Sequence, residues 1–389
     1  MREWKKVKLG DCIKEINEKT IKNNQYEVLS VTKDGIFSQE EFFKKQIASE
    51  NNIGYKIVRK NNLVFSTMNL WMGSLDVLTN YEIGIVSPAY KIFEFNKKLM
   101  LPEYGDYYMK SYYMLEQYKN CSEQGASVVR RNLDLKALLN VEINIPSIEE
   151  QEKIVKILKN IDFIIEKYRN VLEEKDNFIK SQFIEMFENK EFEEKTLDEI
   201  SIISGEYGSN VSAMEYDATL PRYVRITDIT ENGKLDPNSF ASPKNETNID
   251  KYLLQYGDIL FARTGATVGK TYLYEESDGN CIYAGYCIRF RLNTKIVNPE
   301  YIFRYTQTSK YLKWVDIVKR GGAQPNINSK QYGSITIPIP PMELQNKFAE
   351  IVKQVDKQKI SLEQQKQNYK NLKKGLMQKL LTGKVKVNV

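Results

Sequence analysis

The stretch that most suggests catalysis is GATVGKT, from Gly265 to Thr271, because it follows a predicted strand as a phosphate-binding loop does. Such a loop has four residues between its first glycine and the Gly-Lys pair, so that backbone N–H groups surround the phosphates. This chain has three residues there, and the following TYLYEE predicts a strand where the phosphate loop needs a helix. The spacing therefore argues against nucleotide binding, although an enzyme that hydrolyses nucleotides through Lys270 remains an open alternative.

The same loop is better suited to contacting nucleic acid. It is basic and rich in hydroxyl groups, and such side chains donate hydrogen bonds to phosphates and to base edges. The candidate DNA contacts in this half of the chain are Arg225, on the predicted strand YVRITDI, and the loop residues Arg263, Thr264, Thr267 and Lys270.

The first half of the chain has a matching loop, STMNLWMGS, which follows the predicted strand NLVF. This loop carries no charge, unlike its basic counterpart. We count Thr67, Asn69 and Trp71 as candidate DNA contacts, and packing of Trp71 on a sheet is the alternative.

A second candidate patch precedes a proline-containing segment in each half. Arginine, asparagine and glutamine are the side chains that make bidentate contacts with guanine and adenine in the major groove. Glycine and polar residues are also ordinary in solvated turns, which is the alternative at both places. The candidates are Arg130, Arg131 and Asn132 in SVVRRN, and Arg320, Gln324 and Asn326 in KRGGAQPN.

Composition excludes several classes of enzyme. None of the 389 residues is histidine, which removes histidine metal ligands, histidine general bases and Ser-His-Asp or Cys-His nucleophile systems. No amino-methyltransferase motif and no nuclease carboxylate cluster is found in the sequence. The net charge of +6 permits a nucleic-acid partner without requiring one. We therefore expect a chain without catalytic activity and without a bound metal.

The sequence predicts a soluble cytoplasmic protein. The four cysteines form no CxxC pair and are expected to be free thiols of a reducing compartment. No signal peptide is recognised at MREWKKVKLGD, and no apolar run approaches the length of a membrane span.

Two similar segments, 146–189 and 340–389, must position these loops. Five residue pairs share an offset of 194, among them Pro146 with Pro340, Gln151 with Gln345, and Asp162 with Asp356. In each copy a β-branched segment ends in proline, and an acidic first turn then opens a predicted long helix, where carboxylates suit the helix dipole.

Apolar residues recur at heptad spacing along both segments, as in a coiled coil. The first copy contains Ile154, Leu158, Ile161, Ile165 and Leu172, and the second contains Phe348, Val355, Leu362 and Tyr369. A helix this long needs a partner along its length, and the other copy is the natural one. Two unrelated amphipathic helices are the alternative, which the shared offset disfavours.

The remaining sequence forms two globular parts, 1–145 and 190–339, that repeat one layout. GDILFARTGATVGK parallels NNLVFSTMNLWMGS, and AGYCIRFRL parallels SPAYKIFEF. Strand patterns mix with a tyrosine-rich helical pattern in each part, so we predict two tandem α+β domains, each followed by a long helix. The beginning and end of the two parts are similar, whereas their central segments differ. This pattern favours two domains that perform the same task on two different targets.

The combination resembles the specificity subunit of type I restriction-modification systems over essentially the full chain. The segments that carry the resemblance are IPSIEEQEKI, IPPMELQNKF, GDILFARTGATVGK, SPAYKIF and KKGLMQKLLTGKVKV. The first helix opens with IEEQ after a single proline, where two prolines and a leucine are usual in the family.

The resemblance implies a non-catalytic subunit that reads double-stranded DNA. In the family, two target recognition domains each read one half of a split, asymmetric site, and the two helices pair antiparallel as a coiled-coil spacer. The helices dock two methyltransferase subunits, and restriction subunits with motor and nuclease activity join them. S-adenosylmethionine, ATP and Mg are then expected on the partners, with none bound by this chain. The residues expected to act in the spacer and in docking are Gln151, Ile154, Leu158, Ile161, Gln345, Phe348, Val355 and Leu362.

The main alternative is a coiled-coil scaffold that binds protein partners through its two globular ends and does not read DNA. The modest net charge does not exclude it. A steep loss of duplex affinity with added salt, together with competition by a specific sequence, would favour DNA reading.

Overall fold

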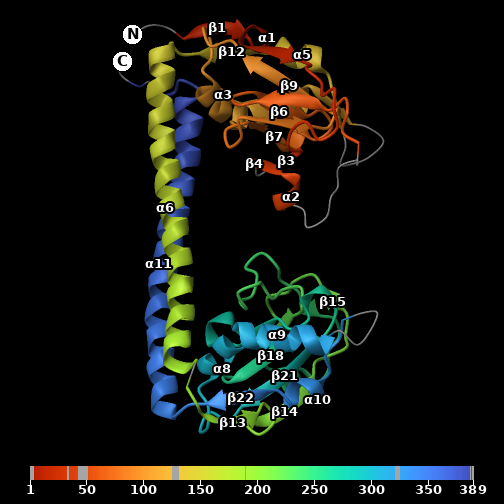
Figure 1. Ribbon diagram of the computed structural model, residues 1–389, viewed down its shortest axis with the longest axis vertical. Coiled ribbons are helices and arrows are strands. Elements are labelled where there is room, and N and C mark those ends of the chain that lie inside the picture. Colours follow the sequence, from red (N-terminus) through yellow and green to blue (C-terminus); the bar gives the residue numbers. More distant parts are fainter. Residues whose placement is uncertain are drawn as a thin grey trace. The chain divides into compact units, whose positions relative to one another are not determined.

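The computed structural model describes residues 4–32, 35–42, 51–124, 131–188, 190–319, 325–385 and 387 (Figure 1). The chain divides into two compact units: unit 1 contains Met1–Asn170 and Glu363–Val389, and unit 2 contains Val171–Leu362. Two long helices, α6 (Ile148–Phe187) and α11 (Met342–Leu380), contribute residues to both units. Each unit is therefore one globular domain together with a segment of both helices.

Unit 1 is built on a four-stranded antiparallel sheet with the order β2-β9-β6-β7. Its strands are β2 (Ile13–Ile16), β6 (Leu63–Ser66), β7 (Leu75–Val77) and β9 (Tyr90–Phe95). The core places the stacked rings of Phe65 and Phe93, with centroids 5.2 Å apart, in one cluster with Tyr104 of α3 (Pro102–Met109). Ile154 and Leu158 of α6 belong to the same cluster, so the long helix is part of the domain core.

Shorter elements complete unit 1. β1 (Lys5–Lys8) pairs antiparallel with β12 (Glu142–Ile145), which leads directly into α6. The others are α1 (Leu9–Cys12), β3 (Leu29–Thr32), β4 (Gly35–Ser38), α2 (Gln39–Phe42), β5 (Lys56–Arg59), η1 (Leu70–Met72), β8 (Ile83–Val86), α4 (Tyr112–Asn120), β10 (Ser122–Gln124), β11 (Arg131–Leu133) and α5 (Leu135–Leu139).

Unit 2 repeats this plan. Its four-stranded sheet has the order β14-β21-β18-β19, and β13 pairs antiparallel with β22, which leads into α11. Outside the four-stranded sheets, β16 and β20 of unit 2 form a parallel pair, whereas β5 and β8 of unit 1 pair antiparallel. The elements are β13 (Glu193–Thr196), β14 (Ser201–Tyr207), β15 (Ala213–Met214), β16 (Arg222–Val224), β17 (Ser242–Pro243), α7 (Ile249–Tyr252), β18 (Asp258–Ala262), η2 (Gly265–Thr267), β19 (Thr271–Leu273), η3 (Glu276–Asp278), β20 (Cys281–Tyr283), β21 (Cys287–Leu292), α8 (Pro299–Tyr305), α9 (Ser309–Val318), α10 (Ser329–Gly333) and β22 (Thr336–Ile339).

The predicted α+β class and the tandem duplication are confirmed by this match of strand order. The tyrosine-rich pattern, however, forms two helices in each unit where the sequence predicts one. In unit 1, α3 ends at Met109, and the Ser111 hydroxyl accepts a hydrogen bond from the Met114 N–H and so caps the start of α4. Thr308 does the same for α9 by accepting from the Tyr311 N–H.

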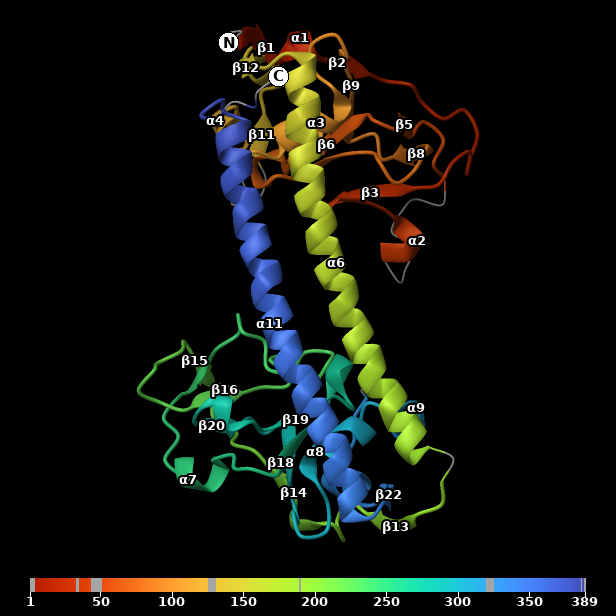
Figure 2. The same cartoon turned by 90° about the vertical axis from the view of Figure 1, so that its left-hand side faces the viewer.

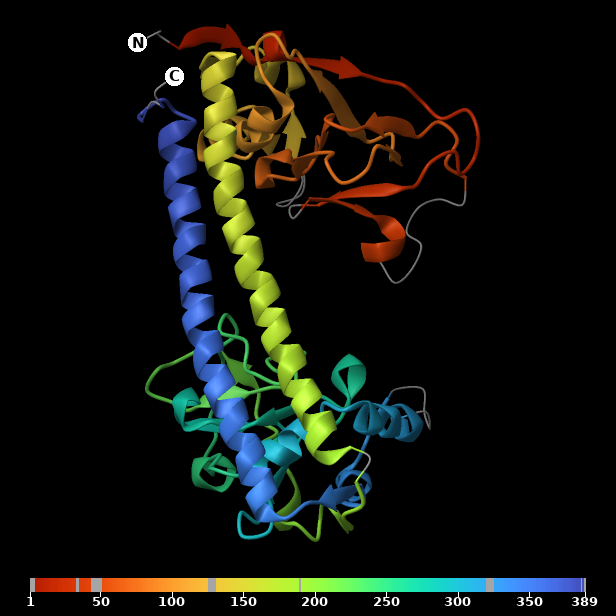
Figure 3. The same cartoon turned by 60° about the vertical axis from the view of Figure 1, so that its left-hand side comes forward.

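The long helices pair antiparallel within each unit (Figures 2 and 3). In unit 1 the Tyr168 hydroxyl of α6 donates to Gln365 of α11 at 2.7 Å, and the rings of Tyr168 and Tyr369 lie 5.7 Å apart. In unit 2 the Lys175 ammonium of α6 donates to Gln358 of α11 at 2.8 Å. Residue numbers fall along α11 as they rise along α6, which confirms the predicted antiparallel pairing.

Candidate nucleic-acid interface

The candidate interface of unit 2 forms where β18 runs into η2. Two backbone hydrogen bonds hold Arg263, the first residue after Ala262: its N–H donates to the Tyr286 carbonyl at 3.0 Å, and its carbonyl accepts from the Ile327 N–H at 2.9 Å. Thr264 forms an antiparallel bridge with Asn326. The loop 263–270 and residue 326, which the sequence predicts as two separate DNA-contacting segments, therefore lie side by side.

The Arg263 side chain contacts an aromatic ring and an asparagine side chain. Its guanidinium carbon lies 4.7 Å from the centroid of the Tyr207 ring, and its Nε donates to Asn326 Oδ1 at 3.4 Å. The Tyr207 hydroxyl accepts a hydrogen bond from the Ser329 N–H at 3.2 Å. Burial opposes ionisation of this phenol, but the contacts with Ser329 and the charge of Arg263 outweigh it and lower the pKa of Tyr207. The guanidinium thus rests on an electron-rich ring that is itself fixed.

The GATVGK segment is a tight connection between two antiparallel strands, β18 and β19. Thr267 donates its hydroxyl to the Thr264 carbonyl at 3.2 Å, and Gly269 has a φ of +89° where a Cβ would lie 2.6 Å from Val315. The glycine is therefore required by the turn and by close packing. Lys270, at the end of the loop, pairs with Glu231 at 2.7 Å.

The corresponding loop of unit 1 contains Thr67, Asn69 and Trp71, between β6 and β7. The guanidinium carbon of Arg131 lies 4.5 Å from the Trp71 ring centroid, and the Arg131 N–H donates to the Met68 carbonyl at 3.3 Å. The structure therefore brings this loop together with the Arg131–Asn132 segment, as it does for the equivalent segments of unit 2. Trp71 is half-buried beneath this arginine. It therefore does more than pack on the sheet, which was the alternative to a DNA contact.

The arginines of the described residues fall into two groups. Six of the nine pair with carboxylates: Arg59, Arg169, Arg225, Arg289, Arg291 and Arg304. The other three, Arg131, Arg222 and Arg263, each lie over an aromatic ring. Arg222 is buried and donates to two backbone carbonyls, those of Asp236 and Ser239. Of the three arginines without a carboxylate partner among the described residues, Arg131 and Arg263 are therefore the two that are not buried.

Arg225, a predicted DNA contact, has a different environment from Arg263. Its Nε and Nη2 donate to the two carboxylate oxygens of Asp228 at 2.9 and 2.7 Å. Although burial opposes ionisation, the bonds from Arg225 and Ser239 lower the pKa of Asp228. The donor edge of Arg225 is therefore occupied within the domain. Three further predicted contacts, Arg130, Arg320 and Gln324, lie outside the described residues.

Sequence reasoning missed the tyrosines beside Arg263. Tyr207 ends β14, and its contact with Arg263 joins strands that are far apart in the sequence. Tyr286, in the segment AGYCIRFRL, is not among the predicted contacts; it is 62 % exposed, and its carbonyl fixes the Arg263 backbone. The alignment of AGYC with SPAY was the available signal for Tyr286, and no sequence signal singles out Tyr207.

The predicted spacer residues are mostly internal. Ile154, Leu158 and Ile161 are buried in the core of unit 1, and Phe348 and Val355 are buried in the core of unit 2. Leu362 is half-buried. The buried ones pack the long helices into the domain cores, so they are not exposed to a partner subunit.

Gln151 and Gln345 show why the repeated glutamine is there. Both are fully buried in the first turns of the long helices. Gln151 accepts from the Leu101 N–H at 2.9 Å and donates to the Leu99 carbonyl at 2.7 Å. Gln345 accepts from the Asn298 N–H at 2.7 Å and donates to the Pro340 carbonyl at 2.7 Å. Each glutamine thus latches the start of a long helix to the residue that precedes α3 or α8.

We expect Gln345→Leu to lower the free energy of unfolding of unit 2 by about 1–3 kcal/mol, because it leaves a buried N–H and a buried carbonyl without partners. Chemical denaturation of the whole chain measures the loss. The matched control is Gln354→Leu on the same helix, where the exposed side chain bonds only Glu350, and its effect should stay within about 0.5 kcal/mol. Equal losses in the two variants would contradict the latch.

Aspartates at matching positions add a polar link between each domain and the helices. In unit 1, Asp162 of α6 accepts from the Tyr107 hydroxyl of α3 at 2.6 Å and pairs with Lys373 of α11 at 2.5 Å. Burial and the bond to Asp162 both raise the pKa of Tyr107. One carboxylate therefore contacts the domain and the partner helix together.

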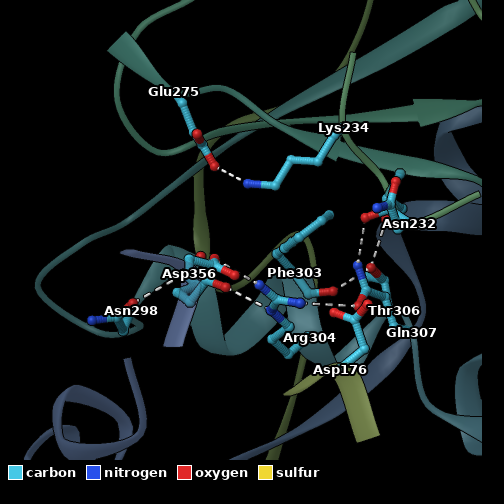
Figure 4. Close-up of polar contacts among 12 residues, drawn as sticks. Asp176, Asn232, Lys234, Glu275, Asn298, Phe303, Arg304, Thr306, Gln307 and Asp356 are labelled. Carbon is cyan, nitrogen blue, oxygen red and sulfur yellow. Dashed lines mark hydrogen bonds and ion pairs between the residues drawn. The ribbon is translucent and has the colours of Figure 1, made fainter. Parts of the chain in front are cut away.

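In unit 2 the equivalent carboxylate is Asp356 of α11. It pairs with Arg304 of α8 at 3.3 Å, and Figure 4 shows the guanidinium directed at it. Arg304 also pairs with Glu300 at 2.6 Å, and Lys359 of α11 contacts Asp176 of α6. Asp162 and Asp356 thus both link a long helix to its domain, whereas in unit 2 the contact between the helices is made by Lys359 with Asp176.

The described residues contain neither a metal-binding cluster nor a helix that could span a membrane. No cluster of three or more cysteine, aspartate or glutamate side chains there could hold a metal ion. No helix in the same residues combines the length and the apolarity that crossing a membrane requires.

The chain was compared with known proteins. A family model described as type I restriction modification DNA specificity domain matches residues 1–174 and 189–369. The chain is 26% identical over 419 residues to the type I restriction enzyme MjaVIII specificity subunit of Methanocaldococcus jannaschii, an alignment that covers 99% of this chain and 93% of that relative.

Two solved structures share the fold. One, from work on complex assembly and conformational transition of the type I R-M system, superposes with a TM-score of 0.53 at 15% identity over 99% of both chains. The other is the type I restriction-modification S subunit from M. genitalium, with a TM-score of 0.52 at 14% identity over 97% of this chain and 96% of that one.

Proposed function

This chain belongs to the type I restriction modification DNA specificity family, and from that premise we propose that it selects the DNA site on which a restriction-modification complex acts. One observation carries the proposal. Each unit brings the loop that follows β6 or β18 together with the segment that precedes α5 or α10, and each places an arginine over an aromatic ring there. Two such surfaces suit a protein that reads two half-sites.

The two half-sites should differ in sequence. Unit 1 presents Trp71 with Arg131, whereas unit 2 presents Tyr207 with Arg263 and adds Lys270. Base choice follows the donors and acceptors at the contact, so unlike surfaces select unlike bases. The recognised site is then bipartite and asymmetric.

The long helices provide the surface for partner subunits in this proposal. Apolar side chains that this chain leaves exposed there are Phe163, Phe178, Ile184, Ile360 and Leu372. We assign them to docking of two methyltransferase subunits, with restriction subunits joining the assembly. The chain itself performs no catalysis, and S-adenosylmethionine, ATP and Mg are bound by those partners in the cytoplasm.

Co-expression with the methyltransferase subunit, followed by mapping of methylated adenines in the host DNA, tests the function. The expected result is methylation confined to one split motif. A stable complex that modifies no motif would contradict DNA reading and favour the scaffold alternative, and failure of the subunits to associate would contradict the partner assignment.

Lys270→Gln should weaken binding of the assembled complex to all duplexes alike. The Lys270 ammonium is a point charge that can exchange exposed Glu231 for a phosphate, and removing one phosphate contact lowers the slope of log affinity against log salt by about 1. Titrations of cognate and unrelated duplexes at several salt concentrations measure this. A changed methylation motif in this variant would mean that Lys270 reads a base.

A further inference from the structure

Arg263 differs from the carboxylate-paired arginines of the described chain and from buried Arg222, whose guanidinium donates to two backbone carbonyls. Both its backbone groups are hydrogen-bonded to neighbouring segments, its guanidinium lies on the Tyr207 ring, and no carboxylate of the described residues neutralises it. We propose that Arg263 is a specificity-determining residue that reads a guanine in the half-site of unit 2, an inference that rests on the proposed function.

The contacts leave one edge of the guanidinium for a ligand. The Tyr207 ring lies against the group, and Nε is engaged by Asn326 Oδ1 at 3.4 Å. The two terminal nitrogens have no hydrogen-bond partner among the described residues, and they carry parallel N–H groups. Two parallel donors match the O6 and N7 acceptors that guanine alone displays side by side in the major groove.

A phosphate also accepts two parallel hydrogen bonds, so the choice between base and backbone needs a further argument. Phosphate contacts require charge but no fixed direction of the side chain, and Lys270 at the end of the same loop, whose present partner Glu231 is exposed, is suited to that kind of contact. Fixing Arg263 on Tyr207, with Asn326 holding Nε, limits where its terminal nitrogens can lie. Such a constraint is useful for discriminating one base from another.

Unit 1 provides an independent example of the same chemistry. Arg131 lies on Trp71, yet the arginine comes from the segment before α5 and the ring from the loop after β6. In unit 2 the arginine comes from the loop after β18 and the ring from β14. Both units therefore hold an arginine on an aromatic ring, although the two residues come from different positions of the fold. This is expected if the arginine–ring contact itself is needed for recognition.

The test uses the full chain in complex with its methyltransferase subunit, with Arg263→Gln and Arg263→Lys as variants. Both should still direct methylation, but to a motif that has become degenerate at one guanine of one half-site. Discrimination against the other bases at that position should fall about 10- to 100-fold, as for loss of a bidentate pair. Arg263→Lys is informative because it retains the charge and loses the planar pair of donors.

The matched control is Arg169→Gln, an exposed arginine of α6 paired with Glu166, which should leave the motif unchanged. If Arg263→Gln weakens binding to every duplex alike and Arg263→Lys restores it with an unaltered motif, Arg263 contacts a phosphate and the inference is wrong. A wild-type complex that methylates no motif would instead overturn the proposed function. Thermal unfolding of each variant separates these results from a loss of folding.

Discussion

Insertion of seven residues into both α6 and α11 should lengthen the gap between the half-sites by about three base pairs and leave both half-sites unchanged. Seven helical residues add about 10.5 Å, and base pairs follow one another every 3.4 Å along B-DNA. One heptad also returns the apolar seam to nearly the same face of each helix. The expectation rests on the proposed function.

The structure indicates where to make the insertions. The boundary between the units falls after Asn170 in α6 and after Leu362 in α11. The contact of Tyr168 with Gln365 lies on one side of it, and the contact of Lys175 with Gln358 lies on the other. Insertions at these two points leave the pairing within each unit as it is.

Mapping of methylated adenines measures both the gap and the half-sites in one experiment. The matched control inserts the same seven residues into α6 alone, which puts the two helices out of register and should abolish specific methylation. Half-site bases that change with the double insertion, or a gap that does not, would contradict a spacer role for the helices.

The two-domain, two-helix architecture of this protein was predictable from its sequence. The duplication repeats the same residues at a constant offset, which can be checked within one chain. Gln151 and Gln345 share the offset of the helices, and the structure shows that both make the same buried latch. The pairing of the two helices could also be predicted, because the heptad pattern is local in the sequence and determines which face of each helix is apolar. These features depend on residues that are close in the sequence or repeated in it.

The candidate interface was predictable only in part. Arg263 and Asn326 were nominated separately, but their contact requires the bridge between Thr264 and Asn326, which no local pattern announces. Arg225 and Arg263 were nominated on equal terms, and only packing distinguishes them, because Asp228 occupies the donor edge of Arg225. Residue type indicates which hydrogen bonds a side chain can form. The neighbours in the folded structure determine whether its donors are still available for a ligand.

The aromatic junction of unit 2 should be the most sensitive part of the helix pair. Phe348 of α11 is fully buried, and its ring lies edge-on to Phe183 and Phe187 of α6 with centroids 5.5 and 5.3 Å apart. Phe183 also stacks on Tyr301 of α8 at 5.6 Å. The same cluster therefore joins both helices to the domain.

We expect Phe348→Ala to lower the free energy of unfolding of unit 2 by about 3–5 kcal/mol, from lost apolar burial and the cavity left behind. A domain of this size has a total stability of about 5–15 kcal/mol, so unit 2 would be close to unfolding at 37 °C. Chemical denaturation followed by the fluorescence of Trp314, which packs within unit 2 against Tyr311, reports the change.

Phe178→Ala is the matched control because it removes the same side chain from α6 at a position that is 45 % exposed. Little apolar surface is lost there, so its cost should stay below about 1 kcal/mol. A large loss at Phe348 with a small one at Phe178 would mean that the helices are held to unit 2 by this junction. Equal losses would instead mean that the helix pair is stabilised evenly along its seam, and the polar contacts between Lys175 and Gln358 would then matter as much as the buried rings.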